Sequence, residues 1–533
     1  MGRKREVIYY EGRLQGKFLT TEVCDKLENL LRLNKDRGLV SDLKNIIYDL
    51  PPSDVQQIKE TKSNESVNLR KGTLENHQTI GVAYMYFAKR LVLGDSVGLG
   101  KTVEVCGLCN LLESTYAKRG EDFKFLYLTG KNLVEQAREE LIKFTGNYVE
   151  VVHGDNSLKT SVKNFCKNNS AYYDLSNSVV ATHSVLNSVD FQDWFRGFTE
   201  ANGYPPFDLM VVDESGDILA NDSNKIYKNG KFFASQIEYC ILLNATTFEK
   251  ELKMFYNQLS FVDDTFLPTK TSFQKEYEIM SYTGPYPVFS GKYKNQEKFR
   301  QLVSYRYFAR TRRGSGAVMK NCSADVIVVP LSSEQKWLLK RTSMPNMVYD
   351  CPSYFGMGEI ETTEETTPKL KALLSLLTEE LRDEQSILIY SRYKEAQLCI
   401  QKALHENGID AFILNGESSQ DTRNAIIDKF KLGDLRVLIT NVQKGLNFGN
   451  CNYCIFYTYD PNPNKMVQFE GRMTRSYNIE NKHVYLLLSR GDELKTFKNV
   501  VADRAQSSDI FAGSDFSCVL SILLDEDKIG SLK

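Results

Sequence analysis

Short apolar runs alternate with amphipathic, helix-like stretches along most of the chain. A first series comprises RLVLGD, KFLYLTG, SVVATH, DLMVVDE and YCILLNA, and a second comprises SILIYS, DAFILNG, RVLITN, YCIFYTY and HVYLLLS. Continuous apolar strands that alternate with helices are typical of a parallel sheet covered by helices on both faces. The pattern therefore predicts an α/β fold with two lobes in series.

Changes in composition indicate where these lobes begin and end. At 533 residues the chain exceeds what one hydrophobic core usually organises, so at least two domains are expected. We expect an N-terminal accessory region (1–70), a first lobe (71–250), a basic and aromatic insertion with helical character (251–325), a connector (326–368), a second lobe (369–500) and a C-terminal tail (501–533).

The charge balance is nearly neutral. The chain has 67 Lys and Arg against 68 Asp and Glu, so a polyanion-binding surface would have to come from local clusters. No apolar run approaches the ~20 residues that cross a bilayer, and no membrane association is expected. We expect a cytoplasmic protein of a bacterium or a phage-infected cell, or a nuclear one if the source is eukaryotic, acting as a monomer or as a subunit.

Eleven cysteines are scattered without a disulfide framework, as in a reducing compartment. Two C-x-x-C pairs, Cys106/Cys109 and Cys451/Cys454, could together hold zinc. Because one pair lies in an apolar helix and the other beside a strand, we favour packing in the core for both pairs.

A glycine-rich loop follows the first apolar strand, in LVLGDSVGLGKTVEVCGL. Gly98 and Gly100 let backbone N–H groups approach phosphates, and the start of the next helix adds its positive dipole end. Lys101 is expected to reach the β- and γ-phosphates of ATP, and the Thr102 hydroxyl to bind Mg²⁺. Asp95 stands where the strict G-x-x-x-x-G-K-T pattern has its first glycine. A glycine-rich turn without a ligand is the alternative.

Two acids end a later strand, in FDLMVVDESGDI. Beside a phosphate loop, Asp213 would hold Mg²⁺ through water and Glu214 would polarise the attacking water. The same Asp-Glu pair is often structural when it stands alone.

Two arginines at helical spacing occur in the second series, in QFEGRMTRSYN. Arg472 and Arg475 would share one helix face and could point together at a triphosphate, for which the planar guanidinium is suited. Exposed surface arginines are the alternative.

These three elements, in this order, resemble helicase superfamily two, and most closely its Swi/Snf-type branch, which is related to the DEAD/DEAH-box proteins. ENHQTIGVAYM is similar to the branch's Y-Q-x-x-G-V-x-W-L motif, DSVGLGKT to its DEMGLGKT, and RVLITNVQKGLNFGN with QFEGRMTR to its closing motifs. The resemblance covers roughly residues 70–490, and the composition fits a compact bacterial or bacteriophage member.

The resemblance implies two tandem RecA-like P-loop lobes that hydrolyse ATP with Mg²⁺ between them. It also implies that Gln78 reads the adenine and that Gly445 and Gln468 contribute to nucleotide binding. Arg472 and Arg475 would act as arginine fingers. The sequence departs from the family pattern at Gly216, where the family has a histidine, and at Ala245-Thr246 and DPNPN.

By the same resemblance, nucleic acid would contact both lobes mainly through its phosphates. The implied contacts are Lys131, Asn132, Thr182, His183, Ser391, Arg392, Thr440 and Asn441. A basic cluster between Lys292 and Arg313 is interleaved with aromatic residues. It could be a nucleic-acid surface that includes Arg310, Arg312 and Arg313, or equally a helix with a solvated basic face and a buried aromatic face.

The function that these features indicate is an ATP-dependent translocase or helicase acting on DNA, with double-stranded DNA as its partner. An RNA helicase and an ATP-binding regulatory subunit that does not hydrolyse ATP are the alternatives. No clear strand-separating hairpin is evident from the sequence, and the aromatic segment between Phe255 and Tyr307 is the candidate for such a wedge.

Overall fold

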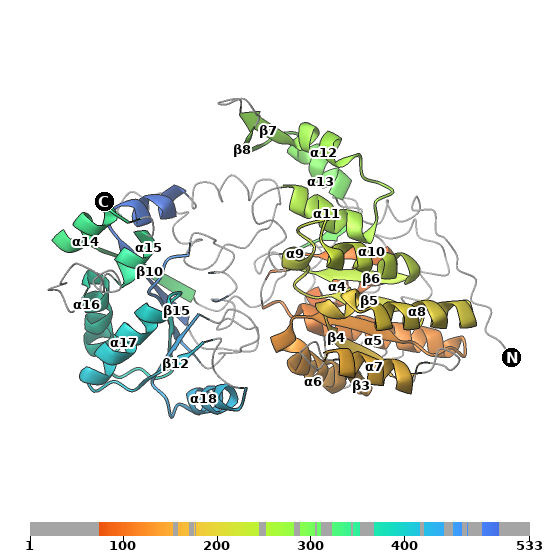
Figure 1. Cartoon of the computed structure of the whole chain (residues 1–533), viewed down its shortest axis with the longest axis horizontal. Coiled ribbons are helices and arrows are strands. Elements are labelled where there is room, and N and C mark those ends of the chain that lie inside the picture. The colour runs from red at the N-terminus through yellow and green to blue at the C-terminus, as the bar shows by residue number, and fades with distance from the viewer. Residues whose placement is uncertain are drawn as a thin grey trace. The chain divides into compact units, whose positions relative to one another are not determined.

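The computed structural model describes residues 74–96, 98–152, 158–169, 175, 177–244, 252–281, 288–303, 306–310, 322–342, 345–351, 367–415, 420–441, 451–460, 466, 469 and 482–499. These residues fall into two compact units. We call residues 74–310 the first lobe and residues 322–499 the second lobe, and we describe each by itself (Figure 1).

The first lobe is built on a seven-stranded sheet in the order β3-β4-β2-β5-β6-β1-β9, with every neighbouring pair parallel. Its strands are β1 (Arg90–Leu93), β2 (Phe125–Thr129), β3 (Val149–Val152), β4 (Ser178–Thr182), β5 (Leu209–Val212), β6 (Tyr239–Leu243) and β9 (Tyr307–Phe308). Five of the seven are the apolar runs of the first series, so this part of the sequence prediction is confirmed.

Helices cover both faces of this sheet. Alternate side chains of β1 point to opposite faces, with Leu91 and Leu93 in one apolar cluster and Val92 in the other. The first cluster includes side chains of α4 (Asn76–Ala88), α5 (Lys101–Lys118) and α6 (Val134–Thr145). The second includes those of α7 (Leu158–Asn168), α8 (Val189–Asn202), α10 (Lys225–Gln236), α11 (Leu252–Val262), α12 (Lys270–Tyr277) and α13 (Gln296–Val303).

Residues 252–310 belong to the first lobe instead of forming a separate insertion. Phe255, Phe273 and Phe299 are buried in the same cluster as the sheet, and β9 pairs with β1. Between α12 and α13 lies an antiparallel hairpin of β7 (Glu278–Ser281) and β8 (Val288–Tyr293), which projects from one end of the lobe in Figure 1. The hydrophobic pattern does not predict this hairpin.

The second lobe has a six-stranded, fully parallel sheet in the order β10-β15-β14-β11-β13-β12. The strands are β10 (Cys322–Val329), β11 (Ile387–Tyr390), β12 (Ala411–Leu414), β13 (Val437–Thr440), β14 (Tyr453–Phe456) and β15 (Lys482–Ser489). The five runs of the second series are all strands, as predicted, and β10 adds a sixth that overlaps the expected connector.

The second lobe contains the helices α14 (Ser333–Leu339), α15 (Pro345–Asp350), α16 (Pro368–Ser375), α17 (Lys394–Glu406) and α18 (Gln420–Leu432), and residues 492–499 after β15 are also helical. Helix α16 begins where Thr367 caps the backbone N–H of Leu370 and Pro368 follows the cap. A π-helical turn, Leu376–Glu380, extends it. None of the described helices of either lobe has the length and apolar character needed to cross a lipid bilayer.

Candidate nucleotide site and nucleic-acid interface

The phosphate loop joins β1 to α5 at the carboxyl edge of the first sheet. Gly98 and Gly100 have φ angles of 87° and 85°, in the left-handed region that glycine adopts most easily. Gly100 caps α5, so the unpaired N–H groups of the first helical turn face the loop. Backbone donors are therefore available to surround a phosphate group, as the sequence predicts.

The Lys101 side chain lies inside this loop. Its Nζ donates to the carbonyl oxygens of Asp95 at 2.6 Å and Ser96 at 3.3 Å. Burial lowers the pKa of Lys101, while the nearby carboxylates of Asp95, Glu214 and Asp213 act to raise it. The ammonium is thus held near both predicted acids by contacts to backbone oxygens.

Both acids lie at the same edge of the sheet, because β5 and β1 flank β6 and run parallel to it. The Asp213 carboxylate accepts from the Tyr127 hydroxyl at 3.1 Å and from the backbone N–H of Glu214 at 2.9 Å. Glu214 itself has a φ of 52°. A non-glycine residue in this region carries strain of about 1–3 kcal/mol and is found mainly at functional sites.

Oxygen ligands for a magnesium ion occur beside the loop. The Tyr127 hydroxyl contacts both Asp213 and Thr102, which brings the predicted carboxylate and hydroxyl ligands next to one another. Mg²⁺ usually takes one or two carboxylates and completes its shell with phosphate and water. Within the described ranges no three His, Cys, Asp or Glu side chains form a metal-binding group. A hydroxyl beside a carboxylate suits Mg²⁺ chemically, and Mg²⁺ binding by Thr102 and Asp213 stays a prediction.

Gln78 is fixed against the phosphate loop. Its Oε1 accepts from the backbone N–H of Glu75 at 3.0 Å, and its Nε2 donates to the Leu99 carbonyl at 3.1 Å. The His77 ring contacts the same carbonyl at 3.0 Å. A Cβ on Gly100 would lie 2.4 Å from Gln78 Nε2, and the φ of 85° would strain any residue other than glycine. Contact between Gln78 and adenine stays a prediction.

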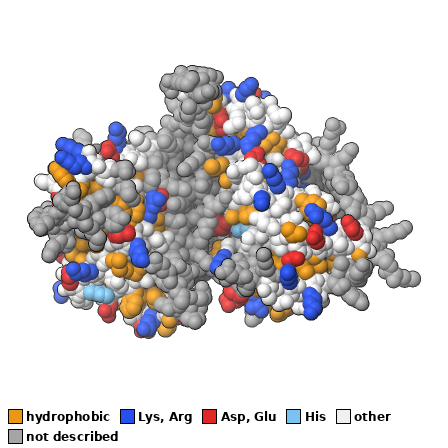
Figure 2. Space-filling view, viewed as in Figure 1, with side chains coloured by type: hydrophobic (Ala, Val, Ile, Leu, Met, Phe, Trp, Pro, Cys, Tyr) orange, Lys and Arg blue, Asp and Glu red, His pale blue; other side chains and the backbone are white. Residues whose placement is uncertain are grey.

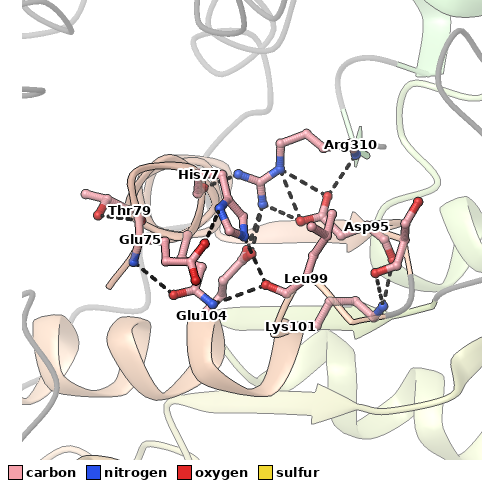
Figure 3. Close-up of polar contacts among 10 residues, drawn as sticks. Glu75, His77, Thr79, Asp95, Leu99, Lys101, Glu104 and Arg310 are labelled. Carbon is pink, nitrogen blue, oxygen red and sulfur yellow. Dashed lines mark hydrogen bonds and ion pairs between the residues drawn. The ribbon is translucent and has the colours of Figure 1, made fainter. Parts of the chain in front are cut away.

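The prediction that Arg310 contacts nucleic acid is wrong. Its side chain is 1% exposed and forms ion pairs with Asp95 and Glu104 inside the first lobe (Figure 3). The acidic partners of Arg310, Asp95 and Glu104, are more than 200 residues away in the chain. The sequence around Arg310 therefore shows only its basic neighbours and resembles a basic surface.

Of the two interpretations of the basic cluster, the solvated basic face with a buried aromatic face fits Lys298 and Phe299, whereas Arg306 and Arg310 are buried, as neither interpretation expected. Arg306 is 4% exposed and pairs with Asp263 at 2.7 Å. Phe299 and Phe308 are buried, whereas Lys298 is exposed and pairs with Glu276. The named residues therefore pack within the first lobe, and among them only Lys298 is exposed. Arg312 and Arg313 lie outside the described residues.

The candidate nucleic-acid contacts of the first lobe lie at the ends of the neighbouring strands β2 and β4, where Thr129 is opposite Thr182. Lys131 begins a short 3₁₀ helix with Asn132 and is exposed. The Thr182 and His183 side chains are buried instead. Contacts from Thr182 and His183 would therefore have to use backbone groups.

His183 connects this edge with the nucleotide site. Its Nε2 lies 2.8 Å from the backbone carbonyl of Asp213, one of the two predicted catalytic acids. No motif in the sequence predicts this contact.

The second lobe has a similar arrangement at β11 and β13, where Tyr390 is opposite Thr440. Arg392 is 42% exposed on its side chain, and Asn441 Nδ2 lies 3.4 Å from its carbonyl oxygen. Ser391 and Thr440 are fully buried. Arg392 and Asn441 are thus the side chains of this set that can reach a ligand, while Gly445, Gln468, Arg472 and Arg475 lie outside the described residues.

A buried polar network surrounds Gly216, which the sequence singled out only as a departure from the family pattern. A Cβ there would lie 2.5 Å from Asn244 Nδ2, so Asn244 occupies the space of a side chain. Gln258 Oε1 accepts from Asn244 at 3.0 Å and from the Ser215 hydroxyl at 3.3 Å. The turn after Glu214 is thereby joined to β6 and α11. The glycine at position 216 is the feature of the sequence from which this network could have been predicted.

Comparisons with known proteins agree with this geometry. The SNF2-related domain matches residues 77–386, more than half of the chain, and the helicase conserved C-terminal domain matches residues 368–477. The ATP-dependent helicase YqhH of Bacillus subtilis, itself uncharacterized, is 22% identical over 75% of this chain and 72% of its own length.

The DNA repair and recombination protein RAD54B of mouse is 23% identical over 81% of this chain, which spans 56% of that protein. Among solved structures, the SWI2/SNF2 ATPase core of Sulfolobus solfataricus in complex with dsDNA is 19% identical, with a TM-score of 0.38, over 83% of this chain and 95% of that one. The description of the fold is based on the strand order of the two sheets and not on this similarity.

The family predicted from the motifs is therefore confirmed. The match extends from the phosphate loop in the first lobe to the C-terminal helicase motifs in the second. The chain belongs to the SNF2-related family of ATP-dependent helicases.

Proposed function

We propose that this protein hydrolyses Mg-ATP at the carboxyl edge of the first sheet and uses the energy to move along double-stranded DNA. The observation that carries the proposal is the convergence of the Lys101 ammonium with the Asp213 and Glu214 carboxylates beside a glycine-rich loop. Membership of the SNF2-related family supports the same reaction.

The described residues divide the chemistry between them. Lys101 neutralises phosphate charge, and Glu214 orients and polarises the attacking water. Thr102 and Asp213 would hold Mg²⁺, which supplies neutralisation of the charge that develops on the phosphates. Gln78 is proposed to contact the adenine from the start of α4. Arg472 and Arg475, together with Gly445 and Gln468, are proposed from sequence alone to complete the site from the second lobe.

DNA would be held through its phosphates by few, defined contacts. On the face that Figure 2 shows, Lys and Arg side chains are scattered among Asp and Glu side chains on both lobes. This distribution agrees with the net charge of −1. Exposed Lys131 in the first lobe and Arg392 with Asn441 in the second are the described candidates. Backbone groups would make the remaining phosphate contacts, from Asn132, Thr182, His183, Ser391 and Thr440.

The test is ATP turnover measured with single-stranded, duplex and forked DNA and with RNA. We expect duplex DNA to stimulate most. Glu214→Gln should keep nucleotide binding and lose turnover by about 10²- to 10⁴-fold, the usual contribution of a general base, whereas Lys101→Ala should lose binding as well. Lys143→Ala, an exposed lysine on α6, is the matched control. Stimulation by RNA alone would make the chain an RNA helicase, and no turnover under any condition would make it a regulatory ATP-binding subunit.

The output of the motor is proposed to be tracking along intact duplex, with strand separation restricted to forks. Separating strands must offset stacking of about 1.4 kcal/mol per base-pair step, which needs a wedge. The β7–β8 hairpin is the described element with a suitable form, and it lies within the segment that the sequence marked as the wedge candidate.

The two ends of the hairpin lie close together, because Lys294 N donates to Tyr277 O at 2.9 Å across its base. Joining these ends with a short glycine linker should leave displacement of a triplex-forming third strand intact and abolish unwinding of forked DNA. Robust unwinding of a simple tailed duplex, without third-strand displacement, would make the chain a conventional helicase.

A further inference from the structure

Three buried charged residues form a cluster beside the phosphate loop of the first lobe. Arg310, Asp95 and Glu104 are each no more than 1% exposed. They come from three parts of the chain, namely the end of β9, the phosphate loop and helix α5 (Figure 3). A buried cation between two carboxylates is stable only if its hydrogen bonds are satisfied.

Arg310 satisfies that condition with every nitrogen of its guanidinium. Nε donates to the Asp95 carboxylate oxygens at 3.2 Å and 3.1 Å, and Nη2 donates to Asp95 and, at 2.9 Å, to Glu104. Nη1 donates to the His77 carbonyl. Although burial alone would lower the pKa of Arg310, the two carboxylates raise it, and it stays charged.

Backbone pairing fixes Arg310 in this position. Residues 306–310 run beside β1, and the Arg310 carbonyl accepts from Ser96 N at 3.0 Å within the phosphate loop itself. Phe308 stacks on Tyr84 of α4 with ring centroids 3.9 Å apart. Gly81 of α4 leaves the necessary room, since a Cβ there would lie 1.9 Å from a Glu104 oxygen.

Asp95 has two faces in this arrangement. Its carboxylate is turned to Arg310, which also donates its backbone N–H to it at 2.9 Å. Its backbone carbonyl is turned to Lys101, at 2.6 Å from Nζ. Of the carboxylates that act to raise the pKa of Lys101, Asp95 has the largest effect. If the guanidinium were absent, Lys101 would be the neighbouring cation for the Asp95 carboxylate.

We propose that Arg310 is a positioning residue for the nucleotide site. By occupying the Asp95 carboxylate it keeps that carboxylate from pairing with Lys101, so the ammonium is available to the phosphates of ATP. The glycine-to-aspartate departure at position 95 and the arginine at 310 then form one functional unit. This inference rests on the proposed ATP-binding function.

The test is the affinity for an ATP analogue, measured on the full chain by equilibrium fluorescence titration. Arg310→Gln should weaken binding by about 10- to 100-fold, the range for one charge-assisted hydrogen bond. Adding Asp95→Asn to that variant removes the competing charge and should restore most of the affinity. A residue that only stabilised the fold would not show this rescue.

Arg306→Gln is the matched control, because Arg306 is a buried arginine of the same segment whose partner Asp263 is outside the phosphate loop. It should lower the melting temperature and leave affinity unchanged. If Arg310→Gln does not fold, Arg310→Lys is compared with and without Asp95→Asn, since lysine keeps the charge but not the planar fork.

Equal affinities of the parent and Arg310→Gln would overturn the positioning role, as would a failure of Asp95→Asn to restore binding. Both outcomes leave ATP binding by the parent intact. A parent protein that binds no nucleotide would instead overturn the proposed function, and the positioning role with it.

Discussion

The two lobes differ at the turn that follows β1 in the first sheet and β11 in the second. After β1 the chain passes through residues 94–100, with Gly98 and Gly100 in the left-handed region, before α5 begins. After β11 three residues suffice to reach α17, and the Gln397 side chain closes the turn by donating to the Ser391 carbonyl at 2.7 Å. The first turn has the backbone conformation that can surround a phosphate, and this contrast supports the nucleotide site proposed for the first lobe.

A second contrast concerns buried charge. Lys369 lies between Asp350 and Glu493, at 2.8 Å from each, and all three are buried in the second lobe. The composition matches that of Arg310 with Asp95 and Glu104. However, Lys369 joins α15, α16 and the helical residues 492–499 that follow β15, whereas Arg310 contacts the phosphate loop. Position relative to the loop, and not charge composition, distinguishes a functional group of charges from an architectural one.

The sharpest test of the assignment concerns the arginines of the second lobe. Arg472→Ala and Arg475→Ala should each reduce DNA-stimulated hydrolysis by about 10³-fold or more, the scale of an arginine finger, with little change in nucleotide affinity. Lysine should not rescue either variant, because it lacks the planar fork. Turnover and nucleotide titration decide this, and an affinity loss as large as the rate loss would indicate a structural role.

The contrast between the two charge groups is tested at Lys369. Lys369→Met leaves two buried carboxylates unpaired and should lower the free energy of unfolding by about 3–5 kcal/mol, measured by denaturant titration. Nucleotide affinity should not change. Neutralising Asp350 and Glu493 as well should recover most of the stability. A selective loss of nucleotide affinity without destabilisation would contradict the contrast.

The smallest expected effect is on DNA binding, where the two lobes should be alike. Lys131→Ala and Arg392→Ala should each weaken binding evenly across sequences and reduce the slope of log affinity against log salt by about 1. Lys402→Ala, 81% exposed and paired with Glu406 on α17, should leave the slope unchanged. An unchanged slope in Arg392→Ala would show that Arg392 does not contact the DNA phosphates.

Sequence patterns predicted much of the fold because its central strands are buried on both faces and therefore read as apolar runs. They did not reveal β9, which is two residues long, or the β7–β8 hairpin. Lys101, Asp213 and Glu214 were predictable because each follows a strand at the same edge of the sheet. Arg310 was assigned to a surface because charge alternation in a short segment cannot show a partner that arrives from a distant part of the chain.

The pairing of residues 306–310 with β1 also has a consequence for folding. Asp95 and Arg310 are 215 residues apart, so the sheet closes beside the phosphate loop only after nearly the whole first lobe has been synthesised. Contacts of such long range form late and slowly. On the ribosome, a chain that ends before residue 306 would carry the complete glycine-rich sequence yet lack the strand and the cation that fix it. Nucleotide could therefore act as a ligand that stabilises the native lobe, and not as a template for its early folding.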